Sequence, residues 1–221
     1  MLDLLKEFID IVLHIDVHIQ QWVVDYRSWT YLILILIIFC ETGLVVTPFL
    51  PGDSLLFAAG TVCALPGQPL ELRMVIVFLI AAAFIGDNTN YFIGRYLGMK
   101  VYERNYRLIR RDYLNKTHAF YEKHGGKTLI IARFMPIIRT FAPFVAGVGT
   151  MQYFRFFSFS IVGNVIWVVC FSLAGFYFGN IPAIKNNFSL VILGIIFVSL
   201  IPILIAIVKK LVERRRSRRT S

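Results

Sequence analysis

The sequence is poor in charge and in cysteine, and acidic residues are scarce in its second half. Only 16% of its 221 residues are Asp, Glu, Lys or Arg, whereas 57% are hydrophobic and the mean hydropathy is +0.70. This composition excludes an ordinary soluble domain and is typical of an integral membrane protein. The three cysteines all lie in apolar segments (Cys40, Cys63 and Cys170), which favours free buried thiols over a disulfide framework or a metal site.

Histidine is absent from the apolar segments. The four histidines all lie outside them: His14, His18, His118 and His124. His14 and His18 are spaced to share a helix face, but without a nearby third ligand they do not predict a metal site. An enzyme acting on lipid phosphates would need a nucleophile or base beside its cationic residues, and neither a metal triad nor a nucleophile elbow is visible. We therefore expect no catalytic activity, no cofactor and no metal.

The apolar segments predict an all-α polytopic membrane protein. Residues 1–27 carry apolar side chains at helical spacing, including Ile15, Ile19, Trp22 and Tyr26, which predicts an amphipathic helix in the membrane interface. A first repeat is expected at 28–98, with a hairpin at 29–66 and a transmembrane helix at 74–98, and a basic amphipathic linker follows at 99–127. A second repeat is expected at 128–180, with a hairpin at 128–149 and a transmembrane helix at 153–179. The chain then continues with a C-terminal transmembrane helix at 188–208 and a basic tail at 209–221.

Prolines interrupt two of the apolar segments. A continuous helix through Pro48 and Pro51-Gly52 is disfavoured because each proline removes a backbone hydrogen bond, and Pro136 and Pro143 interrupt the later segment in the same way. Half-helices of about ten residues reach ~15 Å each, which is half the bilayer. We therefore expect each segment to be a re-entrant hairpin that enters the membrane and returns to the same side.

Short internal echoes indicate that this unit is duplicated. The stretch Phe57–Gly60 resembles Phe144–Gly147, and Gly94–Gly98 resembles Gly175–Gly179. Each pair occupies corresponding positions in a broken segment and in the span that follows it. A hairpin plus a spanning helix, present twice with opposite orientation, would form an inverted repeat like those of many secondary transporters.

Charge is distributed very unevenly along the chain. Residues 1–99 carry 4 basic and 9 acidic residues, whereas residues 100–221 carry 19 basic and 4 acidic residues. By the positive-inside rule the linker and the tail are both expected to be cytoplasmic, so one of the three apolar segments between them must return without crossing. The tail adjoins a span, which favours contact with anionic lipid over nucleic acid.

Two arginines lie deep in apolar sequence. Arg133 and Arg139 would each cost at least about 2.5–3.5 kcal/mol near the bilayer centre, so both need partners. The planar guanidinium suits phosphate oxygens, and a half-helix start near Arg139 would add backbone N–H groups. Arg133 and Arg139 are therefore candidates to bind an anionic group such as a phosphate. Glu41 and Asp53 would neutralise the arginines without lipid and take up protons when lipid displaces them.

Each of these residues also has a structural interpretation. Asp53 follows Pro-Gly and would suit a helix cap, Arg133 would reach the cytoplasmic surface by snorkelling, and all four charged residues would suit a permanent ion-pair network. Asp87 either lines the pathway or bonds to free backbone groups. Asn164 and Trp167 are expected to serve helix packing and interface positioning.

The longest motifs resemble a known family. Glu41-Thr-Gly, Pro48-Phe-Leu-Pro51-Gly52-Asp53-Ser54 and Arg133-Phe-Met-Pro136-Ile-Ile-Arg139 are similar to those of the DedA family, also called the VTT or SNARE-associated Golgi protein family. The likeness covers nearly the whole chain. It implies a multi-pass protein of the bacterial inner membrane that moves lipids between leaflets, with undecaprenyl phosphate as the bacterial substrate. The family's essential acids correspond to Glu41 and Asp53, and its essential arginines to Arg133 and Arg139.

Two other functions remain open from the sequence. A proton-coupled exporter of cationic compounds would bind its substrate at Glu41, Asp53 and Asp87, although the paired arginines would repel a cation. An envelope or division assembly factor would tolerate charge-neutral replacements at the four sites. The expected partners are an anionic lipid, protons and the membrane, and a homo-oligomer is left open.

Overall fold

The computed structural model describes residues 15–44, 52–67, 69–104, 126–185, 187–191, 193–194 and 197. Several predicted features therefore lie outside the described residues. These are the first part of the N-terminal helix, the break at Pro48 and Pro51, residues 105–125 of the linker, most of the helix at 188–208 and the tail at 209–221.

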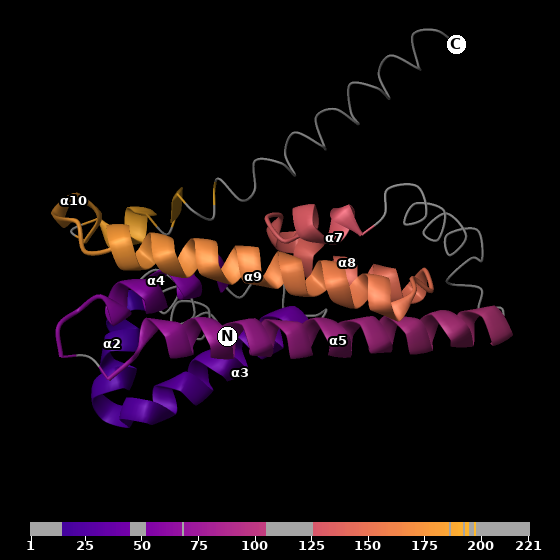
Figure 1. Ribbon diagram of the computed structural model, residues 1–221, viewed down its shortest axis with the longest axis horizontal. Helices are drawn as coiled ribbons and strands as arrows, with labels where there is room; N and C mark the ends of the chain where they lie inside the picture. The colour runs from indigo at the N-terminus through magenta and orange to yellow at the C-terminus, as the bar shows by residue number, and fades with distance from the viewer. Residues whose placement is uncertain are drawn as a thin grey trace, which may run out of the picture.

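Every regular element of the described part is a helix (Figure 1). The helices are α2 (Ile15–Tyr26), the short 3-10 helix η1 (Arg27–Trp29), α3 (Thr30–Gly43), α4 (Gly52–Cys63), α5 (Leu72–Arg104), α7 (Lys127–Ala132), α8 (Pro136–Val148), α9 (Tyr153–Phe178) and α10 (Pro182–Lys185). Three stretches are long and apolar enough to cross a membrane: Val17–Gly43, Leu72–Gly98 and Tyr153–Phe178. The predicted all-α membrane protein class is therefore confirmed.

The two longest helices, α5 and α9, form the centre of the arrangement. They lie against each other and run in opposite directions (Figure 1). The shorter helices are divided between them, because α3 and α8 pack mainly on α5 while α4 and α7 pack mainly on α9. Each pair of short helices that is consecutive in sequence is thus split across both long helices.

Glycines bring α4 and α9 together at backbone distance. A Cβ atom on Gly60 would collide with the backbone carbonyl oxygen of Ser172, and one on Gly175 would collide with that of Phe57. Small residues at such positions let helix backbones approach closely, as is common in membrane helix packing.

The same contact recurs between α8 and α5. A Cβ atom on Gly147 would collide with the carbonyl oxygen of Tyr91, and one on Gly94 would collide with that of Phe144. These contacts correspond one to one with those between α4 and α9. The glycines involved belong to the stretches that resemble each other in sequence. The packing of the first half is therefore repeated in the second half.

A bend separates α2 from α3. Arg27 has a positive φ of 47°, so the membrane-length stretch Val17–Gly43 is not one straight helix. Ile15, Ile19 and Val23 of α2 are buried in the main apolar core, and α2 packs against α4. Tyr26, expected on the apolar face, is exposed, because the helix ends there and the chain turns into η1.

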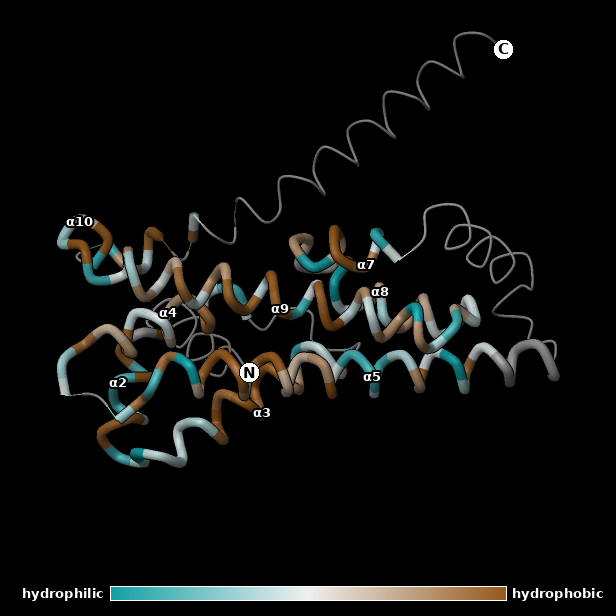
Figure 2. The backbone as a smooth tube through the Cα atoms, viewed as in Figure 1, coloured by the Kyte–Doolittle hydropathy of each residue, from teal (hydrophilic) through white to brown (hydrophobic). Residues whose placement is uncertain are grey.

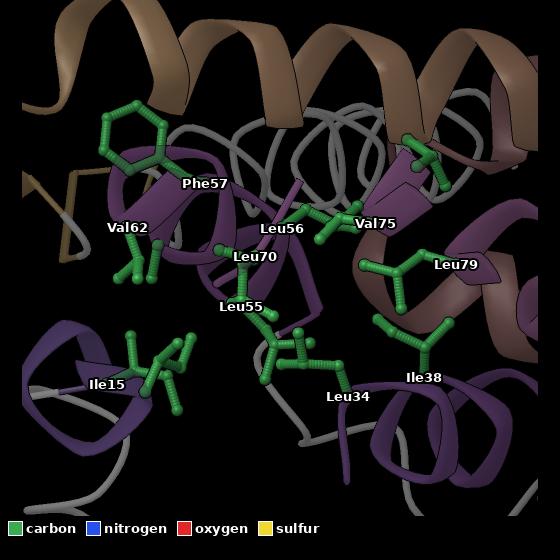
Figure 3. Close-up of a cluster of buried hydrophobic side chains, with 14 of the residues drawn as sticks. Ile15, Leu34, Ile38, Leu55, Leu56, Phe57, Val62, Leu70, Val75 and Leu79 are labelled. Carbon is green, nitrogen blue, oxygen red and sulfur yellow. The ribbon is translucent and has the colours of Figure 1, made fainter. Parts of the chain in front are cut away.

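The main hydrophobic core lies mostly among the helices of the N-terminal half of the protein, α2, α3, α4 and α5. Figure 3 shows side chains of α3, α4 and α5 converging, among them Leu34, Leu55 and Leu79. Large hydrophobic side chains also cover the outside, especially along α5 and α9. Polar residues gather at the bend between α2 and α3 (Figure 2). An apolar exterior of this kind suits contact with lipid.

Two glycines of α9 give a matched test of the close packing. Gly175→Ala should lower the free energy of unfolding by about 1–3 kcal/mol, because the added methyl overlaps the backbone of α4. Gly163→Ala should leave stability unchanged or raise it by up to about 1 kcal/mol, since the nearest atom to its Cβ would be the Cα of Ile130 at 3.5 Å. The measurement is unfolding of both purified variants in detergent, and equal stability would contradict the packing.

Candidate functional site

The start of α8 positions Arg139. Pro136 occupies the beginning of this helix, where proline costs nothing because a first-turn N–H has no partner within the helix. The backbone N–H of Arg139 donates to the carbonyl of Met135 at 2.8 Å, which closes the first turn. Arg139 therefore projects from a helix N-terminus, and its side chain is buried, with 3% exposed.

Arg139 forms ion pairs with Glu41 and Asp53, and thereby connects α8 to α3 and α4. Glu41 lies in the last turn of α3 and Asp53 in the first turn of α4. Glu41 Oε1 also accepts a hydrogen bond from the Gly52 N–H at 3.2 Å. Glu41 therefore caps the backbone at the start of α4, although its position inside a helix gave no reason to expect this.

Arg133 pairs with the third acid, Asp87 of α5. Arg133 follows the short helix α7 and is only 4% exposed, so it does not extend to the surface. The same oxygen of Asp87, Oδ2, accepts hydrogen bonds from Ser160 at 2.5 Å and Asn164 at 3.0 Å. Asp87, which the sequence left between two roles, is thus the counter-ion of an arginine.

Trp167 of α9 lies close to both arginines. Its indole Nε1 donates to Asp53 Oδ1 at 2.7 Å. Its ring centroid lies 5.0 Å from the Cζ of Arg139 and 5.6 Å from that of Arg133, within the range of a cation–π interaction. The aromatic ring therefore contacts both cations and one of their acids.

Asn164 and Trp167 belong to the charged cluster. Packing and interface positioning were expected for them, but both side chains bond to site acids. The available signal was their spacing, since Ser160, Asn164 and Trp167 are at i, i+4 and i+7 and form one polar stripe on an otherwise apolar helix.

Asn90 holds the surrounding backbone together. Its Nδ2 donates to the carbonyl of Thr42 at 3.1 Å and to that of Thr140 at 2.6 Å. The end of α3 and the first part of α8 are thereby fixed to α5, so the residues next to Glu41 and Arg139 share one anchor.

The cluster has more acids than bases. It contains three carboxylates and two guanidinium groups, so its net charge is −1 when all of them are ionised. An unbalanced charge is costly at a buried site, and one bound proton would neutralise the cluster. Within the described residues, no group of three or more His, Cys, Asp and Glu side chains is placed to hold a metal ion.

A small cavity lies beside both arginines. Its volume is about 10 Å³, and its lining includes Asp87, Arg133, Arg139 and Ser160. This is room for about one water molecule. Arg133 Nη1, Arg139 Nε and Asp87 Oδ1 are buried without a hydrogen-bond partner, so the cluster retains capacity for a polar ligand. A larger anion would have to displace the carboxylates.

Comparison with known proteins identifies the family. Residues 50–177 match the VTT domain. The chain is 53% identical to Protein DedA of Escherichia coli K12 over 209 residues, which cover 94% of this chain and 95% of the relative.

The chain belongs to the DedA, or VTT-domain, family. It is also 42% identical over 185 residues to an uncharacterized membrane protein of Mycobacterium tuberculosis H37Rv, covering 83% of this chain and 81% of the relative. The Inner membrane protein YqjA of E. coli K12 is 33% identical over 153 residues, 69% of each chain. No solved structure matches. The VTT match includes Asp53, Asp87, Arg133 and Arg139, whereas Glu41 precedes it.

A double-mutant cycle tests the Asp87–Arg133 pair. Asp87→Asn should lower the free energy of unfolding by about 3–5 kcal/mol, because Arg133 stays buried without its counter-charge. Adding Arg133→Gln should recover part of this loss. Asp25→Asn is the control, since Asp25 is exposed on α2. If Asp87→Asn proves as harmless as Asp25→Asn in detergent unfolding, the buried ion pair does not form.

Proposed function

We propose that this DedA family protein is a transporter that moves an anionic lipid with a phosphate head group, undecaprenyl phosphate, between the leaflets of a bacterial inner membrane. The observation that carries the proposal is the burial of two arginines together in an apolar helix bundle, with a nitrogen of each unpartnered. The name of the relative YqjA, an inner membrane protein, supports the location.

The geometry suits an exchange of anions at Arg133 and Arg139. A phosphate ester offers several oxygens to guanidinium groups, as the carboxylates of Glu41, Asp53 and Asp87 do at present. The Asp53–Arg139 pair also joins the first turns of α4 and α8, so two helix N-termini converge on the site and favour an anion. Lipid phosphate would replace the carboxylates, and the carboxylates would return when it leaves.

Proton coupling follows from the charge balance. The cluster already has one acid in excess, and a phosphate adds further negative charge. Acids displaced from Arg139, namely Glu41 and Asp53, would lie buried without a counter-charge unless they bind protons. Lipid binding would therefore take protons from one side of the membrane, and lipid release would return them.

We also propose the membrane architecture predicted from the sequence, an inverted repeat of re-entrant hairpins. The antiparallel α5 and α9 would be the spanning helices of the two repeats, and the broken pairs α3–α4 and α7–α8 would be the hairpins. The repeated glycine packing between α4 and α9 and between α8 and α5 supports this assignment. The linker and the tail would face the cytoplasm. As expected from the sequence, the carrier would act without covalent chemistry.

Reconstituted transport tests this function directly. Purified wild type, Arg139→Ala and Glu41→Gln would be compared in proteoliposomes for movement of undecaprenyl phosphate between leaflets, with and without a pH gradient. Both substitutions should slow movement at least about tenfold, since a hydrogen bond to a charged group contributes ~1.5–3 kcal/mol. A gradient should change the wild-type rate.

The control is Arg155→Ala, because Arg155 is an exposed arginine on α9 and outside the cluster. It should transport like the wild type. The proposal is wrong if Arg139→Ala and Glu41→Gln, shown to be folded and inserted, also transport like the wild type. Activity that is retained in cells but absent from vesicles for all lipids would favour an assembly role.

A further inference from the structure

A second cavity lies beside the arginine cavity, between α7 and α8. This α7–α8 groove has a volume of about 280 Å³ and is lined mainly by Ile131, Met135, Ile138, Phe141, Ala142 and Val145. Ile131 is 64% exposed, and Ile138 and Phe141 are more than a third exposed. The groove is therefore apolar and open to the surroundings of the protein, which for a membrane protein include lipid.

The groove and the arginine cavity are neighbours. Ala142 lines both of them, and adjacent residues of the chain divide between the two sides. Leu129 and Arg133 face the arginine cavity, whereas Thr128 and Ala132 face the groove. A charged cavity and an apolar cavity therefore lie next to each other, with Ala142 lining both.

The two cavities differ in what they can bind. The arginine cavity is small and cationic groups line it, so it suits a compact anion, with Arg133 Nη1 and Arg139 Nε unpartnered. The groove is larger and its lining carries no charged side chain, so it suits hydrocarbon. A molecule that fills both has an anionic head joined directly to an apolar chain.

We propose that the α7–α8 groove binds the part of the hydrocarbon chain nearest the head group of the transported lipid phosphate, with the head group at Arg133 and Arg139. This rests on the proposed function. The chain would lie along Ile138 and Val145, and the head would pass Ala142 to reach the arginines. A second copy of this protein is a less suitable occupant, because a stable interface needs about 800 Å² on each partner and the groove is one cleft between two short helices.

Photo-crosslinking tests the location of the chain. Farnesyl phosphate carrying a diazirine at the end of its chain would be irradiated with the full-length protein in vesicles of zwitterionic phospholipid. Labelled peptides should come from residues 128–145, and unlabelled undecaprenyl phosphate should suppress the labelling. Labelling spread evenly over the outer faces of α5 and α9, without competition, would overturn the inference.

Variants that fill the groove separate this inference from the proposed function. Ile138→Trp and Val145→Phe should lower both crosslinking by farnesyl phosphate and transport of undecaprenyl phosphate at least about tenfold. They should leave the affinity for dimethylallyl phosphate, which has the same head and a short chain, unchanged. Ile166→Trp, on the exposed face of α9, is the matched control and should behave like the wild type.

The outcomes remain distinguishable. If Arg139→Ala abolishes transport but the groove variants do not, the chain binds elsewhere and the proposed function stands. If Arg139→Ala transports normally, the proposed function itself fails. If the groove variants change the mass of the particle measured by light scattering, the groove is an interface between copies and the inference is overturned.

Discussion

Two guanidinium groups buried in an apolar helix bundle must each meet a carboxylate, and the arrangement of the helices satisfies this requirement. The acids come from three different helices, with Glu41 on α3, Asp53 on α4 and Asp87 on α5. Removing Asp87 would leave Arg133 buried without its counter-charge, whereas Arg139 pairs with both Glu41 and Asp53. The starts of α4 and α8 contribute to this arrangement, because Asp53 and Arg139 lie in the first turns of these helices and pair with each other.

The glycine contacts between helices occur in both halves of the protein, but the charge of the site is divided unequally between the halves. The glycine contacts of α4 with α9 have counterparts between α8 and α5, whereas the acids all come from the first half and the arginines Arg133 and Arg139 from the second. Neither half could bury its own charged residues alone. Complementary charge therefore supplies a reason for the two halves to associate, in addition to their close helix packing. The uneven distribution of basic and acidic residues along the chain is thus also found within this cluster.

The sequence was sufficient for the fold class and for the identity of the charged residues. Charges and prolines are conspicuous in apolar segments, so Glu41, Asp53, Arg133 and Arg139 stood out, and the echoes at the glycines marked the repeated packing. Glu41 and Asp53 were expected to neutralise both arginines, which is confirmed for Arg139. The partner of Arg133 could not be derived, because the pairing depends on helices far apart in sequence. Arg133 pairs with Asp87, forty-six residues earlier in the chain. Trp167 was assigned to packing since tryptophan is common at membrane interfaces, and only its spacing from two other polar residues of α9 indicated otherwise.

In the proposed carrier, Glu41 and Asp53 occupy the phosphate site at Arg139 when no lipid is bound, and this affects how easily the lipid is released. A carrier must release what it binds, and two bare buried arginines would hold a phosphate tightly. In the proposed cycle, re-forming the pairs of Arg139 with Glu41 and Asp53 offsets the loss of the phosphate contacts. The free energy cost of releasing the phosphate is therefore small. The same acids must be neutral while the phosphate is bound, which ties each exchange to proton binding. The hydrocarbon chain in the α7–α8 groove would never leave an apolar environment, so only the head group needs this compensation. The ion pairs seen in the structure are thus suited to both stability and exchange.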